Sequence, residues 1–191
     1  GAVAILATKD VNVNVPVIKV TDTNQAMSEA LSKFYNEPDK KMKIIGITGT
    51  DGKTTLAAII YQLINKIDNC AYIGTNGIEC KSFSKVTEFT TPFPKELYSY
   101  LNDFYQAGCK YLVMEASSEG LLTKRLIGLS FDVTICTNIT RDHLDKHKTM
   151  VNYVSSKCEL FKLVKKDGYC IVNNDDEYAD TVKKACRGKI I

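Results

Sequence analysis

The chain contains no tryptophan, only two histidines and only four prolines among its 191 residues. It also has no apolar run approaching the roughly 20 residues that a membrane-spanning helix requires, so we expect no membrane insertion. Lys and Arg outnumber Asp and Glu by 25 to 22, and no block of basic residues occurs. Because this small surplus is spread along the chain, it offers no electrostatic basis for binding nucleic acid. The expected partners are small molecules.

The seven cysteines form no Cys-x-x-Cys pair, and no histidine lies beside them at metal-ligand spacing. An odd number without such pairs suits neither a zinc site nor a disulfide framework. Cys136 follows Thr134-Ile135 in an apolar segment, where a free cysteine behaves as a small hydrophobic residue. Reduced thiols are typical of the cytosol, and the first residues show no secretory signal pattern. We therefore expect a cytoplasmic protein.

A polar, proline-containing stretch at residues 36–41 divides the chain unequally. Before it, the pattern predicts strands at 2–7 and 17–20 and a helix at 22–35 that Asp22 caps. After it, strand-like and helix-like segments alternate: strands 42–48, 71–75, 110–115, 131–136 and 168–172, and helices 54–67, 95–107, 149–165 and 175–186. This alternation predicts an α/β fold, a mostly parallel sheet with helices on both faces, in which ligands bind beyond the carboxyl ends of the strands.

The first predicted strand after residue 41 runs directly into the loop Gly49-Thr50-Asp51-Gly52-Lys53-Thr54-Thr55. Glycines, a helix start, a lysine and a hydroxyl are the parts of a phosphate-binding loop, with Lys53 directed at phosphates and Thr54 at Mg²⁺. The usual spacing requires glycine at position 47, which is Ile47 here. The loop is therefore a variant form. A glycine-rich turn with a surface lysine is the alternative.

Two further polar sites follow predicted strands. Glu115 ends one strand, where it is suited to bind Mg²⁺ with Thr54, although an acid that caps a helix is the alternative. His143 lies in the loop after the strand at 131–136, together with Asn138 and neighbouring acids. These polar neighbours favour a ligand or catalytic role for the histidine over a structural one.

The predicted helix at 149–165 carries an apolar stripe, and Lys157 lies on that stripe. A lysine that faces inward must extend its amine to solvent, pair with an acid or lose its charge. From periodicity alone, extension to solvent is the commoner outcome.

The spacing and order of several motifs resemble the Mur ligase family, and within it the synthetases of the UDP-N-acetylmuramoyl-tripeptide. The resemblance rests on Thr48-Gly49-Thr50-Asp51-Gly52-Lys53-Thr54-Thr55, Thr90-Thr91-Pro92, Met114-Glu115-Ala116-Ser117-Ser118, Thr137-Asn138, Asp142-His143-Leu144-Asp145, Tyr153, Lys157, Leu160-Phe161 and Asn173-Asn174-Asp175-Asp176. The shortened phosphate loop is the form found in this family. The family has a P-loop ATPase domain between an N-terminal UDP-binding domain and a C-terminal domain.

The resemblance implies a set of roles for residues of this chain. ATP would contact Gly49, Thr50, Asp51, Gly52, Lys53, Thr54, Thr55, Asn138 and Asn173, the last of these near the adenine. One Mg²⁺ would bind Thr54 and Glu115, and a second His143 and Lys157 in carbamylated form. The catalytic residues would be Lys53, Glu115, His143 and Lys157, and the muramoyl-dipeptide would contact Thr90, Thr91, Ser117 and Arg125. A carbamate turns an inward cation into an anionic oxygen ligand, which reverses the expectation from periodicity.

Three positions depart from the family pattern. Asp51 replaces the usual asparagine, Glu119 stands where these synthetases usually have histidine, and Thr123 where some have glutamine. The first places an extra negative charge beside the phosphates, and the other two alter contacts to the dipeptide.

The resemblance implies that ATP phosphorylates the dipeptide carboxylate of UDP-MurNAc-L-Ala-D-Glu and that the amine of diaminopimelate or lysine then attacks the acyl phosphate. Residues 1–41 would be the end of the UDP-binding domain plus a linker, and 42–191 an incomplete central ATP-binding domain. Without the C-terminal domain, we expect little or no ligase activity from this chain alone. A folylpolyglutamate synthetase-type ligase, a small-molecule P-loop kinase and a non-catalytic ATP-binding subunit remain alternatives.

Overall fold

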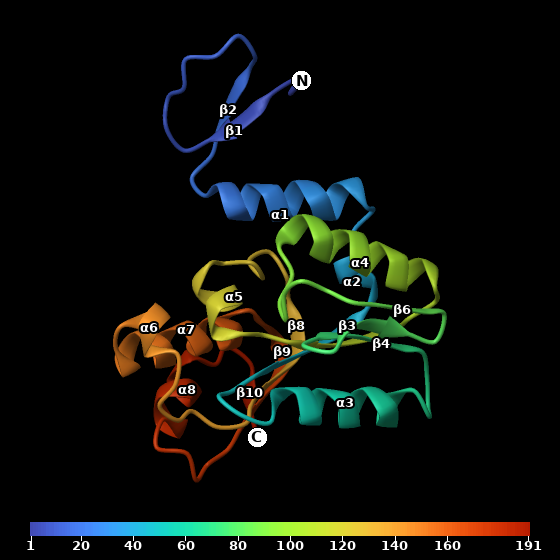
Figure 1. The fold of residues 1–191 in the computed structure, drawn as a ribbon, viewed down its shortest axis with the longest axis vertical. Coiled ribbons are helices and arrows are strands. Elements are labelled where there is room, and N and C mark those ends of the chain that lie inside the picture. Colours follow the sequence, from blue (N-terminus) through green and yellow to red (C-terminus); the bar gives the residue numbers. More distant parts are fainter.

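An eight-stranded sheet runs through the body of the protein, with helices on both faces (Figure 1). The computed structural model describes all residues from 1 to 191. The strands, in spatial order, are β10 (Lys189–Ile190), β9 (Val164–Val172), β8 (Phe131–Cys136), β3 (Lys43–Thr48), β7 (Tyr111–Glu115), β4 (Cys70–Gly74), β5 (Gly77–Cys80) and β6 (Phe83–Lys85). Neighbouring strands from β10 to β4 are parallel, and the β4–β5 and β5–β6 pairs are antiparallel. The predicted α/β class with a mostly parallel sheet is confirmed.

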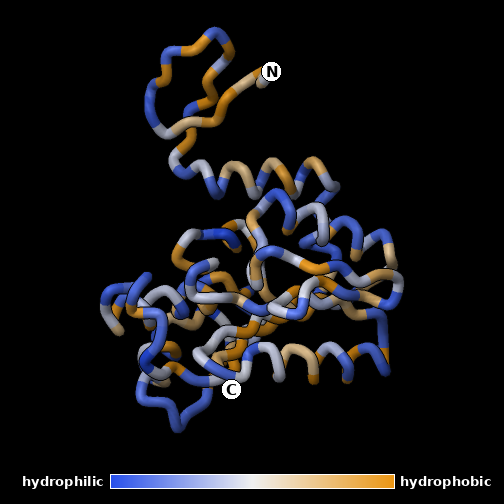
Figure 2. The backbone as a smooth tube through the Cα atoms, in the orientation of Figure 1, coloured by the Kyte–Doolittle hydropathy of each residue, from blue (hydrophilic) through white to orange (hydrophobic).

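The two faces of the sheet pack against apolar clusters of different size. The helices of this body are α3 (Lys53–Ile64), α4 (Pro94–Gln106), α5 (Ser118–Leu122), α6 (Leu144–His147), α7 (Met150–Lys162) and α8 (Ala179–Ala185). The smaller cluster lies under α3 and the larger one under α4, α7 and α8. Successive strand residues face opposite sides, so Val113 packs with α3 while Leu112 and Met114 join the larger apolar cluster under α4 and α7. Figure 2 shows the apolar segments converging in the strands between these layers.

The N-terminal segment projects from this body as a small two-stranded ribbon (Figure 1). Its strands β1 (Ile5–Ala7) and β2 (Val17–Lys19) pair in parallel, and α1 (Thr23–Phe34) connects them to the body by packing on α4. Asp22 caps α1 as predicted, accepting a hydrogen bond from the backbone N–H of Asn24 at 2.9 Å.

The stretch predicted as a linker is a packed turn. It contains the short helix α2 (Pro38–Lys41), in which Pro38 and Asp39 are buried. The Asp39 carboxylate accepts a hydrogen bond from Ser32 of α1 at 2.6 Å. This bond satisfies a buried acid, so a stretch that is polar in sequence is fixed in place rather than free.

Several short elements escaped sequence analysis. The hairpin β5–β6, helices α5 and α6, and strand β10 each contain too few residues for a periodic pattern. A local signal exists for the hairpin, because Asn76-Gly77 follows β4 and Gly77 adopts a φ of +106°. The helix predicted at 175–186 begins later, at Ala179, because the Asp176 carboxylate organises the preceding turn.

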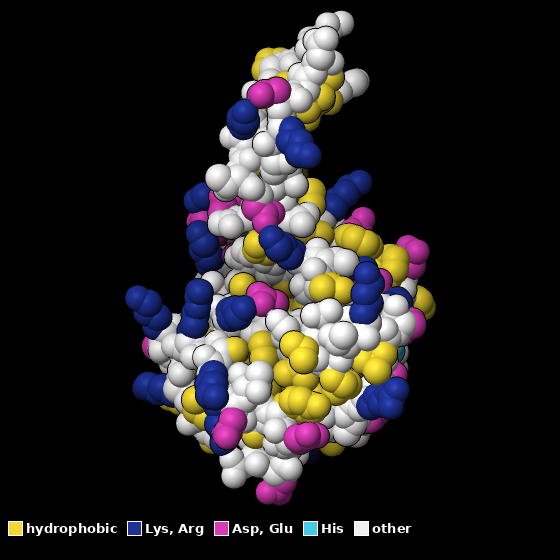
Figure 3. All heavy atoms as spheres, turned by 90° about the vertical axis from the view of Figure 1, so that its left-hand side faces the viewer, with side chains coloured by type: hydrophobic (Ala, Val, Ile, Leu, Met, Phe, Trp, Pro, Cys, Tyr) yellow, Lys and Arg dark blue, Asp and Glu magenta, His cyan; other side chains and the backbone are white.

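The surface matches the charge balance of the sequence. On the face shown in Figure 3, Lys and Arg side chains are dispersed among neutral and acidic ones instead of forming one basic patch. No helix of the chain is both long enough and apolar enough to cross a membrane. Burial raises the pKa of the thiols of Cys70 and Cys136 to about 12, so these cysteines stay protonated near neutral pH.

Candidate active site

The carboxyl ends of the central strands bring the predicted site residues to one edge of the sheet. Ile47 of β3 lies opposite Glu115 of β7, and Thr48 lies opposite Cys136 of β8. The loops that follow these strands therefore start side by side. This is the position at which ligands bind in parallel α/β sheets.

The loop after β3 has the geometry of a phosphate-binding loop. Gly49 and Gly52 adopt φ values of +150° and +79°, and α3 begins immediately afterwards without a side-chain cap. The N–H groups of the first helical turn have no carbonyl partner within the helix, so they can bind an anion. The Lys53 ammonium donates to the carbonyl oxygens of Gly49 at 3.0 Å and Thr50 at 2.8 Å, which holds it over the same loop.

The loop after β8 clamps the phosphate loop from the other side. Asn138 accepts a hydrogen bond from the Thr50 N–H at 2.8 Å through its backbone, and from the Asp51 N–H at 2.9 Å through its side chain. The Thr137 hydroxyl donates to the Asp51 carbonyl at 2.6 Å. Asn173 joins the cluster by donating to the Thr137 carbonyl at 3.2 Å. Of the two asparagines predicted near the nucleotide, Asn138 thus contacts the phosphate loop directly and Asn173 is connected to it through Thr137.

Replacing Gly49 by alanine is expected to destabilise the protein by about 2–3 kcal/mol, whereas Gly52→Ala costs about 1 kcal/mol. A Cβ on Gly49 would approach the Thr137 hydroxyl to 1.9 Å, whereas one on Gly52 meets no atom within 4 Å. Both residues have positive φ, so both variants carry backbone strain, and only Gly49→Ala adds a steric clash. Urea unfolding of both variants checks the difference, and equal losses would contradict the packing shown by Gly49.

Glu115 is fully buried at the end of β7. Its carboxylate accepts hydrogen bonds from the Thr54 hydroxyl at 2.9 Å, the Tyr72 hydroxyl at 2.6 Å and the Thr75 N–H at 3.0 Å. Burial, followed by the Glu115 carboxylate, raises the pKa of Tyr72, which therefore remains a donor. None of these contacts caps a helix, so the alternative of a helix-capping acid is wrong. Thr54 and Glu115 instead place two hard oxygen atoms side by side, the kind of ligand that Mg²⁺ prefers.

Lys157 points into the protein. Its side chain is 1% exposed, its Nζ donates to the Gly49 carbonyl at 2.5 Å, and it lies 4.5 Å from the centre of the Tyr153 ring. Burial, and then the nearby Lys53 charge, lower the pKa of Lys157 to about 7. Extension to solvent, the outcome expected from periodicity alone, is wrong because α7 is covered on this side by the phosphate loop. The amine is therefore part of the site.

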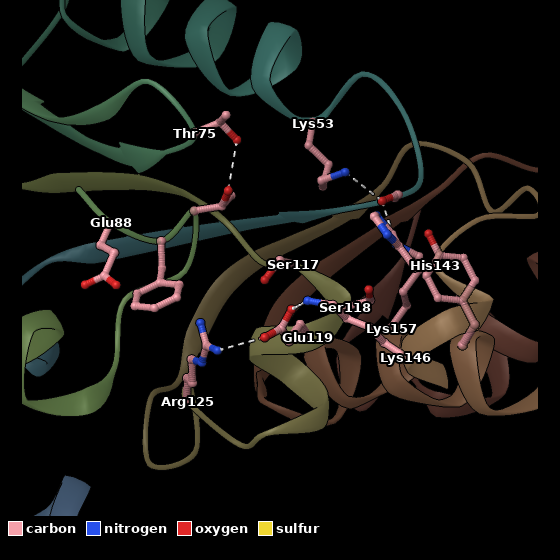
Figure 4. A pocket seen from close by; sticks show the side chains of 14 residues that line it. Lys53, Thr75, Glu88, Ser117, Ser118, Glu119, Arg125, His143, Lys146 and Lys157 are labelled. Carbon is pink, nitrogen blue, oxygen red and sulfur yellow. Dashed lines mark hydrogen bonds and ion pairs between the residues drawn. The ribbon is translucent and has the colours of Figure 1, made fainter. Parts of the chain in front are cut away.

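A cavity of about 340 Å³ connects Gly49, Lys53 and Lys157 with a second set of polar side chains (Figure 4). Its lining is almost entirely polar: Gly49, Lys53, Thr75, Glu88, Phe89, Thr90, Ser117, Ser118, Glu119, Arg125, His143, Lys146, Tyr153 and Lys157. Of the predicted site residues, Thr50, Asp51, Gly52, Thr54, Thr55, Thr91, Glu115, Asn138 and Asn173 do not line it. His143 does, with an exposed ring 3.3 Å from Asp142.

Arg125 is fixed at the far end of the cavity from Lys53 (Figure 4). Its guanidinium lies over the rings of Phe93 at 4.1 Å and Phe89 at 4.9 Å and donates to the Thr91 carbonyl at 3.0 Å. The Thr91 hydroxyl in turn donates to the Glu115 carbonyl at 3.0 Å and accepts from the Ser117 N–H at 2.9 Å. Thr91 thus lies outside the cavity and holds Arg125 and Ser117 in place by hydrogen bonds. Arg125 and Ser117 face the cavity.

Sequence analysis missed several residues of the site. Thr75, which donates to Glu115 and contacts the Thr90 hydroxyl at 3.1 Å, follows β4 at the same sheet edge, and the strand-end rule could have found it. Tyr72 and Lys146 carry no such signal, because strand periodicity and a four-residue helix do not reveal their partners.

Comparisons with known proteins agree with this geometry. Residues 47–191 match the Mur ligase middle domain. The chain is 41% identical over 189 residues to the UDP-N-acetylmuramoyl-L-alanyl-D-glutamate–2,6-diaminopimelate ligase of Clostridium perfringens, covering 96% of this chain and 38% of that relative. A solved structure of a ligase of the same name superposes with a TM-score of 0.86 at 31% identity, covering all of this chain and 40% of that one.

A folylpolyglutamate synthase of Mycobacterium tuberculosis is similar in fold, with a TM-score of 0.68 at 14% identity over 87% of this chain and 46% of that one. The chain spans about 40% of the length of the ligases it matches. The match to the middle domain extends over three quarters of the chain and includes the phosphate loop, Glu115, His143 and Lys157. The chain therefore belongs to the Mur ligase family.

Proposed function

We propose that this chain forms the ATP-binding part of a ligase that joins the amine of diaminopimelate to the dipeptide carboxylate of UDP-MurNAc-L-Ala-D-Glu, in peptidoglycan precursor synthesis. One observation carries the proposal: a single polar cavity has a phosphate loop at one end and a buried arginine at the other. This arrangement can hold a carboxylate substrate with one end against the transferring phosphate. The ligases similar to this chain are named for diaminopimelate, which favours that amine over lysine.

The work of the protein in this reaction is electrostatic. A carboxylate accepts an amine poorly because its oxide is a poor leaving group, and phosphorylation by ATP replaces that group with phosphate. Lys53 can turn from the carbonyls of its own loop to the transferring phosphoryl group. The N–H groups at the start of α3 neutralise the remaining phosphate charge. The chain's own groups thus stabilise charge that grows in the transition state.

The residues of the site fit two Mg²⁺ positions in different ways. Thr54 and Glu115 supply hard oxygen atoms as they stand. At the second position the amine of Lys157 must first become a carbamate, and its lowered pKa supports this because only the neutral amine reacts with CO₂. His143 faces the same cavity and would supply a nitrogen ligand. Bound Mg²⁺ would supply further charge neutralisation at the phosphates.

The proposal assigns residues 1–41 to the end of the UDP-binding domain with its connection, and 42–191 to the central ATP-binding domain. It also assigns the reaction to the bacterial cytoplasm, where ATP is available. In this scheme the amine-selecting residues lie in parts of the ligase outside this chain, so the chain by itself is expected to be inactive. Measurable turnover by the 191-residue chain would contradict that assignment.

The decisive experiment measures phosphate release by the full-length gene product with ATP, Mg²⁺ and UDP-MurNAc-L-Ala-D-Glu, adding diaminopimelate or lysine in turn. We expect release that requires the nucleotide dipeptide and diaminopimelate together. Release with lysine instead would change the amine and leave the reaction class intact. No release with either amine, alongside normal ATP binding, would refute the proposal. It would favour the two alternatives, a folate-type ligase or a non-catalytic ATP-binding subunit.

A further inference from the structure

One acidic side chain lies between the two cations at the substrate end of the cavity. Glu119 of α5 pairs with Arg125 through Oε1 at 3.3 Å and with Lys146 of α6 through Oε2 (Figure 4). Lys146 holds the pKa of Glu119 below its usual value, so the carboxylate is charged at neutral pH. The three side chains line the same cavity as Lys53 and Lys157. An anion of the protein itself therefore lies where an anionic ligand is expected.

The contact between Glu119 and Arg125 leaves part of the arginine unsatisfied. Glu119 reaches only Nη2, while Nε is buried without any hydrogen-bond partner. Guanidinium groups bind carboxylates best in a two-pronged arrangement, in which both oxygen atoms accept from neighbouring N–H groups. A ligand carboxylate that engages Nε and Nη2 together would satisfy the arginine better than Glu119 does.

The two partners also differ in how firmly they are held. Arg125 is fixed by Thr91 and by the rings of Phe89 and Phe93, and its side chain is 5% exposed. The side chains of Glu119 and Lys146 are 40% and 51% exposed. Ion pairs that are open to water contribute little stability, so Glu119 can leave its partners at small cost. The arginine is the fixed part of this group, and the glutamate is the exchangeable part.

We propose that Glu119 is a resident counterion that holds Arg125 and Lys146 ready, and that the non-reacting carboxylate of the nucleotide-linked dipeptide replaces it, with Lys146 as a second cation for that carboxylate. This inference rests on the proposed function. The D-glutamate of that substrate carries two carboxylates, and only one can lie near the phosphates at Lys53. Arg125 lies across the cavity from Lys53, so it meets the other (Figure 4).

The test compares variants of the full-length gene product in substrate-dependent phosphate release. Glu119→Gln removes the competing charge, so the KM for UDP-MurNAc-L-Ala-D-Glu is expected to fall about two- to fivefold at unchanged kcat. Lys146→Met is expected to raise that KM about fivefold. Glu159→Gln and Lys162→Met are matched controls, because they break an exposed ion pair of α7 outside this cavity. The controls are expected to leave KM unchanged.

A second substrate isolates the carboxylate. When D-glutamate is replaced by D-isoglutamine, the non-reacting carboxylate becomes a neutral amide, and the gain from Glu119→Gln is expected to disappear. A raised KM or a lowered kcat in Glu119→Gln would overturn the inference, because the glutamate would then support Arg125 or contact the substrate. An unchanged KM in Lys146→Met would overturn the role of the lysine. Wild-type protein that never requires the nucleotide would refute the proposed function, and the inference with it.

Discussion

Replacing Lys53 by methionine is expected to lower kcat for substrate-dependent phosphate release by about 10²- to 10³-fold. The ammonium lies over the phosphate loop, 3.0 Å from the Gly49 carbonyl and 2.8 Å from the Thr50 carbonyl. It is thus positioned to follow negative charge as the phosphoryl group leaves ATP. Methionine keeps most of the side-chain volume and removes the charge. The fold is expected to survive, because the hydrogen bonds of the Lys53 ammonium go only to carbonyls of its own loop.

The control for this change is Lys66→Met, which removes the same charge from an exposed position just beyond the C-terminal end of α3. Its kcat is expected to equal that of the wild type, and both variants should unfold at the wild-type urea concentration. If Lys53→Met kept more than a tenth of the wild-type kcat, the phosphate loop would bind something other than a reacting phosphate. The proposed reaction would then have to be abandoned.

The strand-end loops of this protein could be located from sequence because their signals are local. The loop at 49–55 follows a buried strand and carries glycines at the positions that need positive φ. Glu115 ends one strand, and Asn138 lies two residues after the end of another. Once a parallel sheet is expected, their meeting at one edge follows from the geometry of the fold.

Contacts between loops could not be derived in this way. The packing of Arg125 on the rings of Phe89 and Phe93 joins segments whose separation is set by side-chain packing, and so does the bridge from Glu119 to Lys146. Lys157 shows the same limit, because the stripe on α7 says only that the lysine faces inward. What covers it, the phosphate loop more than a hundred residues earlier in the chain, is visible only in three dimensions.

Buried Lys157 is expected to give the protein a pH-dependent stability that Lys157→Met lacks. In the unfolded chain the amine titrates near 10.5, and in the folded protein its pKa is lowered to about 7. Between these values the unfolded state binds a proton that the folded state does not, so the wild type gains stability as pH rises. Below pH 7 both states are protonated and the gain is absent. The nearby titratable groups are Lys53, Cys136, Asp142 and Asp51.

Urea unfolding of both proteins at pH 7, 8 and 9, without bicarbonate, Mg²⁺ or nucleotide, measures this effect. The free energy of unfolding of Lys157→Met relative to the wild type is expected to fall by about 2 kcal/mol between pH 7 and pH 9. All other groups are common to both proteins and cancel in the comparison. The Gly49 carbonyl keeps Lys53 as a donor in the variant, so no unpaired buried acceptor complicates it.

Lys162→Met, an exposed change on the same helix, is the control and should show a constant difference across this range. Parallel curves for Lys157→Met and the wild type would mean that Lys157 keeps its charge in the folded protein. A charged amine does not react with CO₂, so that result would also remove the physical basis for a carbamate at this position. A falling difference would instead establish a neutral amine near pH 8, in contact with the phosphate loop, where an anionic oxygen ligand is needed.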